Sequence, residues 1–243
     1  MIPLSSAETQ APAGDDTPTP EPDPRREALL AGLAERLGDE LLESHLQPGV
    51  NLWVRITPAA WVSTMRHLRD DLGFRFFEFL SAIDWLPSPY GRYEEAAVDV
   101  DLHALRDAAL AKDPSELETG VAGGDTRFQV FARVMNLAER DLGIILKVDV
   151  PPAGDDPHQP GSIETITGVY PGADWNEREV HEMYGIGFEG HRNLRTLYLP
   201  SGFEGHPLRK DYPLLARHVK PWPGIVDVEP MPGGSADEEE GDA

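Results

Sequence analysis

Two β-type runs joined by a short polar turn constrain the fold of this chain more than any other feature. Residues 127–137 and 142–150 are rich in Val, Ile, Leu and Phe, and only residues 138–141 separate them. A short polar connection between two such runs is what an antiparallel hairpin requires. The sequence therefore predicts a sheet with this hairpin in it.

Helix and strand patterns alternate before this hairpin. Residues 25–37 place leucines at helical spacing and are followed by Gly38, a typical helix stop. Thr57 is expected to be the N-cap of a second helix, because Pro58 follows it at the first helical position. The expected elements are helices over 25–37, 58–73 and 174–184 and strands over 50–57, 74–84, 127–137 and 142–150.

The two ends of the chain differ in composition from its middle. Residues 1–24 contain six prolines and five acidic residues, and residues 231–243 hold a second acidic run. Such segments bury too little apolar surface to offset the entropy of ordering, so we expect two disordered tails. Between them we expect an α+β domain over 25–184, with a long excursion at 86–125 of no assigned role, and an extended segment over 185–230.

Composition excludes several classes of function. The chain has no cysteine, which removes disulfides, cysteine nucleophiles, thiolate zinc sites and conventional iron–sulfur ligation. Its formal net charge of −22 repels phosphate polymers, so we expect no nucleic-acid partner. No apolar run approaches the roughly 18 residues needed to cross a bilayer, so we expect membrane contact only through a partner.

The predicted helix at 174–184 combines an apolar face with a charged face. Val180 and Met183 share one side at helical spacing, and Arg178 and Glu182 are spaced for an ion pair. By itself this pattern is typical of a surface helix whose charged face is solvated and whose glutamates belong to a structural ion-pair network.

Glycine, proline, histidine and arginine dominate the chain after this helix. Two Gly-His steps, at 190–191 and 205–206, are each followed within four residues by an arginine. These residues give the segment a positive ribbon on an otherwise acidic chain. The ribbon consists of Arg192, Arg195, Arg209 and Lys210. It indicates an acidic partner surface. Because the segment has little apolar periodicity, we expect that partner to order it, and Arg209→Glu to weaken assembly while the domain's melting temperature stays nearly unchanged.

These motifs resemble the signature of the 30-kilodalton subunit of respiratory complex I. The close match covers residues 163–230, and the helix and strand order before it is compatible. The resemblance implies a partner interface at the positions that match, which are Glu177, Arg178, Glu179, Glu182, Tyr184, Gly185, Gly190, His191, Arg195, Gly205, His206, Pro207, Arg209, Lys210, Asp211, Tyr212 and Pro213.

The resemblance also implies a fold, partners and a location. The fold would be α+β, a two-layer mixed sheet with helices on one face, followed by a long extended C-terminal segment. The chain would be a peripheral subunit at the cytoplasmic face of the cell membrane. It would dock chiefly on the 49-kilodalton-type subunit, whose fold resembles a hydrogenase large subunit. It would hold no cofactor, whereas FMN and iron–sulfur clusters in partner subunits would carry electrons from NADH to quinone, coupled to proton translocation.

Two patterns suggest a ligand on this chain, with less support. The run Gly185-x-Gly187-x-x-Gly190, with Asp211 downstream, matches a dinucleotide fingerprint, but a charged helix precedes it where a buried strand belongs. The second pattern is a group of histidines in the C-terminal third that could serve as metal ligands, but their spacing matches no zinc site. They are His181, His191, His206 and His218.

Two other functions stay open. A homologous subunit of a membrane-bound, energy-converting hydrogenase or ferredoxin-dependent oxidoreductase would share this fold and these partners but use another electron donor. A free acid–base enzyme using the Glu177-Arg178-Glu179 cluster would require turnover by the isolated chain.

Overall fold

The computed structural model describes residues 22–88, 102–139 and 142–212. Its helices are α1 (Pro24–Leu37), α2 (Trp61–Asp70), α3 (Leu102–Leu110) and α4 (Ala173–Tyr184). Its strands are β1 (Leu41–Gln47), β2 (Asn51–Ile56), β3 (Phe76–Asp84), β4 (Phe128–Asn136), β5 (Leu142–Asp149), β6 (Pro152–Ala153), β7 (Asp156–Pro160), β8 (Ser162–Glu164) and β9 (Gly187–Glu189). Short 3-10 turns lie at Gly38–Glu40, Pro58–Ala60 and Pro114–Glu116.

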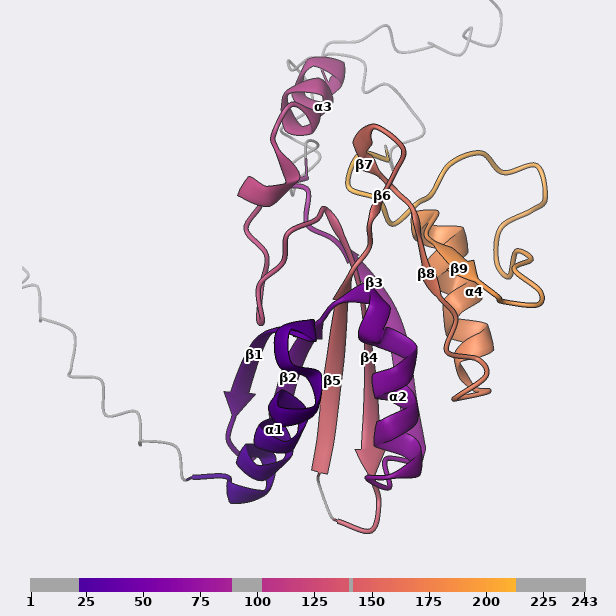
Figure 1. The fold of residues 1–243 in the computed structure, drawn as a ribbon. Helices are drawn as coiled ribbons and strands as arrows, with labels where there is room; N and C mark the ends of the chain where they lie inside the picture. The colour runs from indigo at the N-terminus through magenta and orange to yellow at the C-terminus, as the bar shows by residue number, and fades with distance from the viewer. Residues whose placement is uncertain (1–21, 89–101, 140–141, 213–243) are drawn as a thin grey trace, which may run out of the picture.

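The main sheet is mixed and has the strand order β1-β2-β5-β4-β3. The predicted hairpin is confirmed: β4 and β5 are antiparallel, with Val130 opposite Val148. Strand β2 runs parallel to β5, whereas β1 and β3 pair antiparallel at the two edges (Figure 1). The expected α+β class and mixed sheet are therefore correct.

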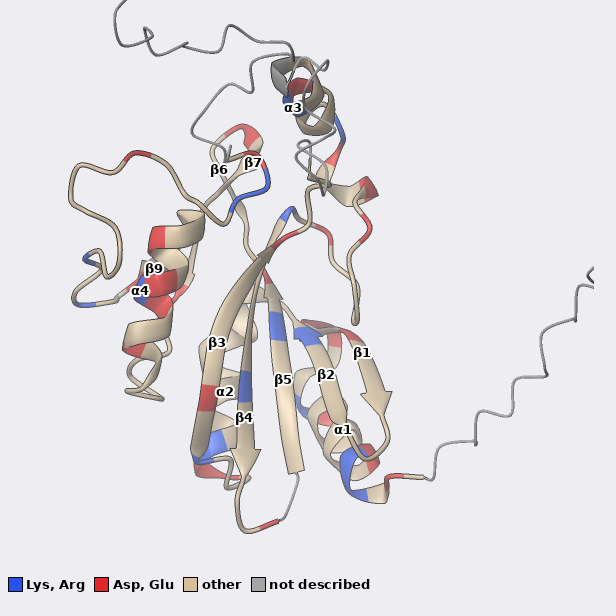
Figure 2. Ribbon diagram, turned by 180° about the vertical axis from the view of Figure 1, so that it is seen from behind, with Lys and Arg blue, Asp and Glu red and all other residues tan. Residues whose placement is uncertain are grey.

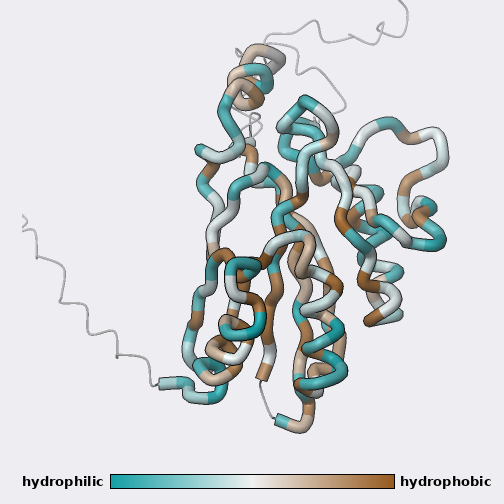
Figure 3. Tube along the Cα trace, in the orientation of Figure 1, coloured by the Kyte–Doolittle hydropathy of each residue, from teal (hydrophilic) through white to brown (hydrophobic). Residues whose placement is uncertain are grey.

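Helices α1 and α2 cover one face of this sheet, which makes the two layers (Figure 1). Alternate residues of the central strands point towards the helices, as the two-residue period of a strand requires. They are Leu52, Val54, Ile56, Val130, Ala132, Val134, Ile144, Leu146 and Val148, all buried. Trp61, Met65 and Leu68 of α2 and Leu33 of α1 meet them in a single apolar core. Figure 3 shows the hydrophobic colours gathered on these elements.

The opposite face of the sheet carries aromatic and charged side chains. The rings of Trp53 and Phe79 both pack on Phe131, with centroids 6.1 and 6.0 Å away. Figure 2 shows this face with its basic residues on β2, β4 and β5. Lys147 on β5 donates from Nζ to the Val121 carbonyl (2.8 Å), which ties the returning end of the predicted excursion to the sheet. Burial lowers the pKa of Lys147 to about 8.

Helix α4 packs against the edge strand β3 together with a small parallel pair, β8 and β9. The ring of Tyr170, in the loop before α4, contacts that of Phe77 in β3 with centroids 5.6 Å apart. Val180, Ile186 and Phe188 are buried here and extend the core beyond the sheet. The helix that carries the sequence motif is thus fixed to the domain by apolar packing.

Several expectations need correction or fall outside the described residues. Thr57 is the N-cap residue with Pro58 after it, but of a 3-10 turn at 58–60 that leads into α2 at Trp61, and its side chain makes no capping hydrogen bond. Strand β1 and the short strands after β5 were not expected, and helix α3 lies inside the predicted excursion. The predicted tails, apart from residues 22–24, and part of the excursion lie outside the described residues.

Candidate interface formed by helix α4 and the C-terminal segment

Residues 185–212, the C-terminal segment, form one unit with helix α4. The segment leaves the helix at Gly185, forms β9, loops away from the body and returns to the end of the helix (Figure 1). The signature residues up to Tyr212 lie in the helix or in this segment. Pro213 and His218 lie outside the described residues.

Gly185 ends helix α4 in a conformation that only glycine adopts readily. Its φ is +78°, the left-handed region, and its N–H donates to the His181 carbonyl at 2.9 Å. A Cβ at this position would lie 2.5 Å from Arg209 Nη2 and 2.7 Å from His206 Nε2. Glycine is therefore required twice, for the backbone turn and for the close approach of the returning segment.

The returning segment caps the last turn of α4. The final carbonyl groups of a helix have no partner within the helix. Here His206 Nδ1, the Leu208 N–H and Arg209 Nε donate at 2.8, 3.2 and 2.6 Å to the carbonyl oxygens of three successive residues, 182–184. Burial lowers the pKa of both His206 and Arg209, and the nearby Arg127 adds to the lowering at Arg209. Two of the predicted interface residues thus bind their own chain.

Glu182 holds the middle of the segment. Its carboxylate accepts the backbone N–H groups of Leu197 (2.9 Å), Tyr198 (3.1 Å) and Leu199 (2.8 Å). Burial opposes ionisation, but these three donors outweigh it, so the pKa of Glu182 is lowered. The carboxylate therefore stays charged and fixes the loop against the helix.

Arg178 does not form the predicted ion pair with Glu182. Its Nε and Nη2 donate to the carbonyl oxygens of Arg195 (3.1 Å) and Thr196 (3.3 Å). Its ion-pair partner is Asp174, one turn earlier, at 3.8 Å. The pattern that suggested a solvated face is misleading, since Arg178 and Glu182 are both buried under the segment that they bind.

Glu177 lies in a closed polar site beneath the segment. It is fully buried, accepts the hydroxyl of Thr165 and accepts the Ile166 N–H at 2.8 Å. Burial raises its pKa to about 7, against the lowering effect of those two hydrogen bonds. His191 Nε2 is 3.9 Å from the Glu177 carboxylate and 3.4 Å from Asp174. His191 Nδ1 accepts the Asn193 N–H (3.0 Å), so Nε2 carries the hydrogen and faces both acids.

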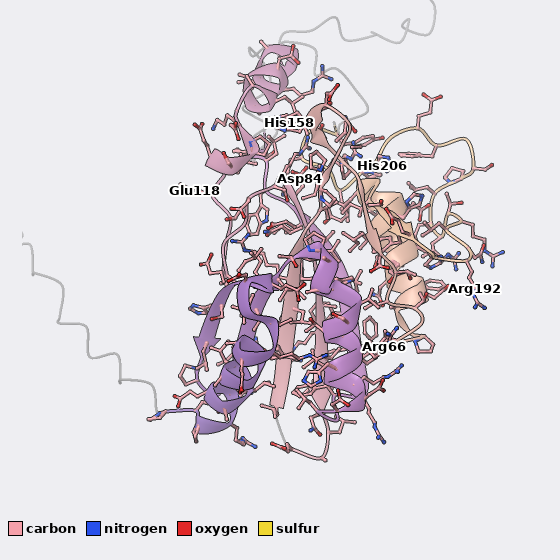
Figure 4. The ribbon with its side chains drawn as sticks, in the orientation of Figure 1. Arg66, Asp84, Glu118, His158, Arg192 and His206 are labelled. Carbon is pink, nitrogen blue, oxygen red and sulfur yellow. The ribbon has the colours of Figure 1, made fainter. Side chains whose placement is uncertain are left out.

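A buried arginine joins the far end of the segment to the sheet. Arg127 donates from Nε and Nη2 to Asp84 at 2.9 and 2.7 Å and pairs with Asp211 of the segment at 3.0 Å. The Lys210 N–H also donates to Asp84, at 2.8 Å. The Phe128 ring lies 4.5 Å from the Arg127 guanidinium and 5.5 Å from that of Arg209. Figure 4 labels Asp84 and His206 in this region, where the sheet end and the segment meet.

The hydrogen bonds of helix α4 position a polypeptide segment. Glu177 has no exposed surface, and the Glu182 carboxylate accepts three backbone N–H groups of the segment. The glycines of the dinucleotide pattern follow a helix and lead into strand β9, which is the reverse of the order that a dinucleotide needs. Asp211, the expected ribose-binding acid, pairs with Arg127 instead.

The remaining signature residues differ in burial and in backbone conformation. Glu179 and Tyr184 on α4 are half-buried. Gly190 and Gly205 adopt positive φ values of +82° and +97°, so both turns need glycine. On the segment, Arg195 and Lys210 are exposed, whereas Pro207 and Tyr212 are half-buried.

Sequence reasoning missed the residues that bind the signature side chains. Asp84 and Arg127 lie in or beside the strands, far from the motifs in sequence, and Thr165 lies 12 residues before Glu177. A charged residue at the end of an apolar run, as at Asp84 and Arg127, signals a buried ion pair, but it does not say with which residue. Among the described residues, no group of three or more His, Asp or Glu side chains could hold a metal ion. None of the described helices is long and apolar enough to span a membrane.

A family profile and curated sequences match this chain. Residues 54–218 match the family described as "Respiratory-chain NADH dehydrogenase, 30 Kd subunit". The NADH-quinone oxidoreductase C subunit of Roseiflexus sp. (strain RS-1) is 34% identical over 193 residues, which cover 79% of this chain and 86% of that one. The NADH-quinone oxidoreductase C/D subunit of Ectopseudomonas mendocina (strain ymp) is 34% identical over 80% of this chain, which spans only 27% of that longer relative.

A solved structure shares the fold. It is the membrane-bound sulfane sulfur reductase, an archaeal respiratory membrane complex. A chain of that complex superposes with a TM-score of 0.52 at 17% identity, covering 79% of this chain and 88% of that one. At this identity the likeness supports the α+β fold alone.

Proposed function

Because the chain belongs to the family of the 30 kDa subunit of respiratory-chain NADH dehydrogenase, we propose that it is a structural subunit of an NADH-quinone oxidoreductase. In this proposal the chain lies in the peripheral arm at the cytoplasmic face of the membrane. It binds chiefly the 49-kilodalton-type subunit at the quinone site. Electrons from NADH pass through FMN and iron–sulfur clusters in other subunits to quinone, and the reaction drives proton translocation.

One observation in the structure carries the structural role. The signature side chains Glu182, His206 and Arg209 bind backbone groups of the chain itself, and Glu177 is fully buried against Thr165 and Ile166. Together these bonds hold an irregular segment in a fixed shape over α4. A surface of fixed shape is what an assembly subunit needs, because preorganisation reduces the entropy lost on association.

The proposal is tested on the chain in its own membranes. A tagged full-length chain is purified after detergent solubilisation, and the proteins that come with it are identified. We expect the other subunits of an NADH-quinone oxidoreductase, with FMN and iron–sulfur centres in the complex. A complex with a hydrogenase or ferredoxin module in place of the NADH module would support the alternative function, and recovery of the chain alone would reject both.

The isolated chain provides a second test. With no cysteine and with its motif residues used internally, the purified chain is expected to show no cofactor absorbance in the visible range and no NADH oxidation. Stoichiometric flavin or iron on the pure chain would contradict the structural role.

A further inference from the structure

Two large aromatic side chains are exposed where helix α4 meets the C-terminal segment. Trp175 on α4 is 54% exposed and Tyr198 in the segment is 53% exposed. Their rings pack nearly perpendicular with centroids 6.3 Å apart, and Trp175 Nε1 donates to the Tyr198 hydroxyl at 3.2 Å. The Arg178 guanidinium lies 5.7 Å from the Trp175 ring. We call Trp175, Arg178 and Tyr198 the aromatic platform.

The platform is rigid although its rings face solvent. The Tyr198 N–H is bound to the Glu182 carboxylate, and Arg178 is fixed by two carbonyl oxygens of the segment. Neither ring belongs to the apolar core, so the fold does not require an aromatic residue at either position. Rigid, exposed Trp, Tyr and Arg side chains are the types that dominate binding energy at protein interfaces.

Positive charge borders the platform. Arg195 lies beside it, since the Arg195 carbonyl accepts a bond from Arg178. Arg192 follows His191, whose Nε2 reaches Asp174 next to Trp175, and Figure 4 shows Arg192 projecting on this side of the molecule. Within the part of the chain that the structure describes, neither Arg192 nor Arg195 has a carboxylate within ion-pair distance. Figure 2 shows the same loop carrying basic residues beside α4.

The charge of the whole chain selects the kind of partner. The carboxylates at the platform are already engaged: Asp174 lies within ion-pair distance of Arg178 and His191, and Glu182 accepts backbone N–H groups of the segment. A formal net charge of −22 opposes binding to nucleic acid or to anionic lipid, where long-range repulsion acts over the whole molecule. A protein surface can satisfy two local arginines with carboxylates and bury the rings at the same time.

We propose that the aromatic platform, with Arg192 and Arg195, anchors this chain on another subunit, whose surface has carboxylates around an apolar pocket. This inference rests on the proposed function. It places the binding energy on Trp175, Tyr198 and Arg195, whereas the Arg209 side chain and the Lys210 backbone N–H hold the segment in place. Trp175 and Tyr198 do not belong to the signature that the sequence singled out.

The test replaces the native copy of the full-length chain with tagged variants and measures the partner subunits recovered from solubilised membranes. Trp175→Ala/Tyr198→Ala removes the rings, and Arg195→Glu reverses an exposed charge whose side chain binds nothing in the described structure. Leu137→Ser, at the turn between β4 and β5, is the matched control, because Leu137 is 67% exposed and lies at the far end of the sheet.

We expect the ring variant to lower recovered partner subunits by at least about tenfold, and Arg195→Glu by several-fold with a smaller salt dependence than the wild type. Arg195→Lys should retain most binding, and the melting temperature of the purified Arg195→Glu chain should stay within about 2 °C of the wild type. Recovery from the ring variant equal to that from Leu137→Ser would overturn the inference and leave the proposed function standing. If the wild type recovered no partner, the proposed function would fall, and this inference with it.

Discussion

The main sheet and the C-terminal segment are held by different kinds of interaction. The residues of β2, β4 and β5 that form the core with α1 and α2 are mainly apolar and buried, so the sheet is stabilised by many small contributions that no single side chain dominates. In the described part of the segment, only Ile186 and Phe188 are buried hydrophobic residues. The rest of its position depends on a few charged groups, each of which can be removed alone. The segment can therefore be released while the sheet stays folded, and a change in one residue tests this directly.

The largest effect is expected where the two regions share a residue. Arg127→Met leaves the buried Asp84 carboxylate without its partner, which costs about 3–5 kcal/mol of unfolding free energy. Urea denaturation of the full chain measures it. Arg133→Met, on strand β4 that begins directly after Arg127, removes a more exposed pair with Glu78; it is the control and should cost at most about 1 kcal/mol. Equal losses in the two variants would mean that Arg127 does not join the segment to the sheet.

The next effect depends on pH and concerns the closed site under the segment. The pKa of Glu177 rises from 4.5 to about 7 in the folded chain, so the folded state holds this proton more tightly. The contribution of this group to the free energy of unfolding is complete below pH 4.5 and is lost as the pH rises to 7. The loss amounts to about 3 kcal/mol, and no further change is expected above pH 7. Glu177→Gln, which keeps an acceptor for the Ile166 N–H, should remove this slope.

The measurement is the difference in unfolding free energy between wild type and Glu177→Gln from pH 4 to pH 8. Asp174 and His191 are the other ionisable groups near Glu177, and both are present in the two proteins that are compared. A difference that does not change between pH 4.5 and pH 7 would show that the carboxyl group is not closed off from water.

A smaller and more local effect separates the two regions. Glu182→Gln loses the charge that binds three backbone N–H groups, at a cost of about 1–3 kcal/mol confined to the segment. Limited proteolysis should cut the segment faster, while hydrogen exchange in β4 and β5 stays as in the wild type. Because the pKa of Glu182 is lowered, its stabilisation is present above pH 4.5 and fades as the solution becomes more acidic. Glu179→Gln on the same helix is the control. If proteolysis cut the segment as fast in Glu179→Gln as in Glu182→Gln, the role of Glu182 would be contradicted.

The smallest effect is expected at Arg209. The sequence suggested that reversing this charge would leave the isolated domain unaffected, but Arg209 binds the Tyr184 carbonyl and Gln159 within the chain. Arg209→Lys keeps the charge and loses the fork geometry, so it should loosen the end of the segment by about 1 kcal/mol. Faster hydrogen exchange at residues 206–212 would report it. Unchanged exchange there would leave Arg209 free for a partner, as the sequence suggested.

The same contrast explains how far the sequence could be interpreted. The β4–β5 hairpin and strand β2 were predictable because local apolar patterning decides which way their side chains point. Glu182 and Arg178 were correctly placed on one helix, yet their partners were not, since these are backbone groups 15 to 18 residues away in an aperiodic loop. Arg127 and Asp211 are 84 residues apart, and no local pattern records such a contact. The glycines of the segment could be located in the sequence, but the side chains that pack against them could not be predicted.

The parallel pairing of β2 with β5 determines when the chain can fold as it leaves the ribosome. Leu52 lies opposite Ile144, so the central strand of the sheet is also its last to be made. The stretch of chain between β2 and β5, including the predicted excursion, must bring its two ends together before these strands can pair. Closure becomes costlier only with the logarithm of loop length, by about 0.6 kcal/mol per doubling, so the extra residues add little. A nascent chain that stops before residue 142 contains the strand pairs β1–β2 and β3–β4 and the helices α1 and α2, but not the strand that joins the two pairs.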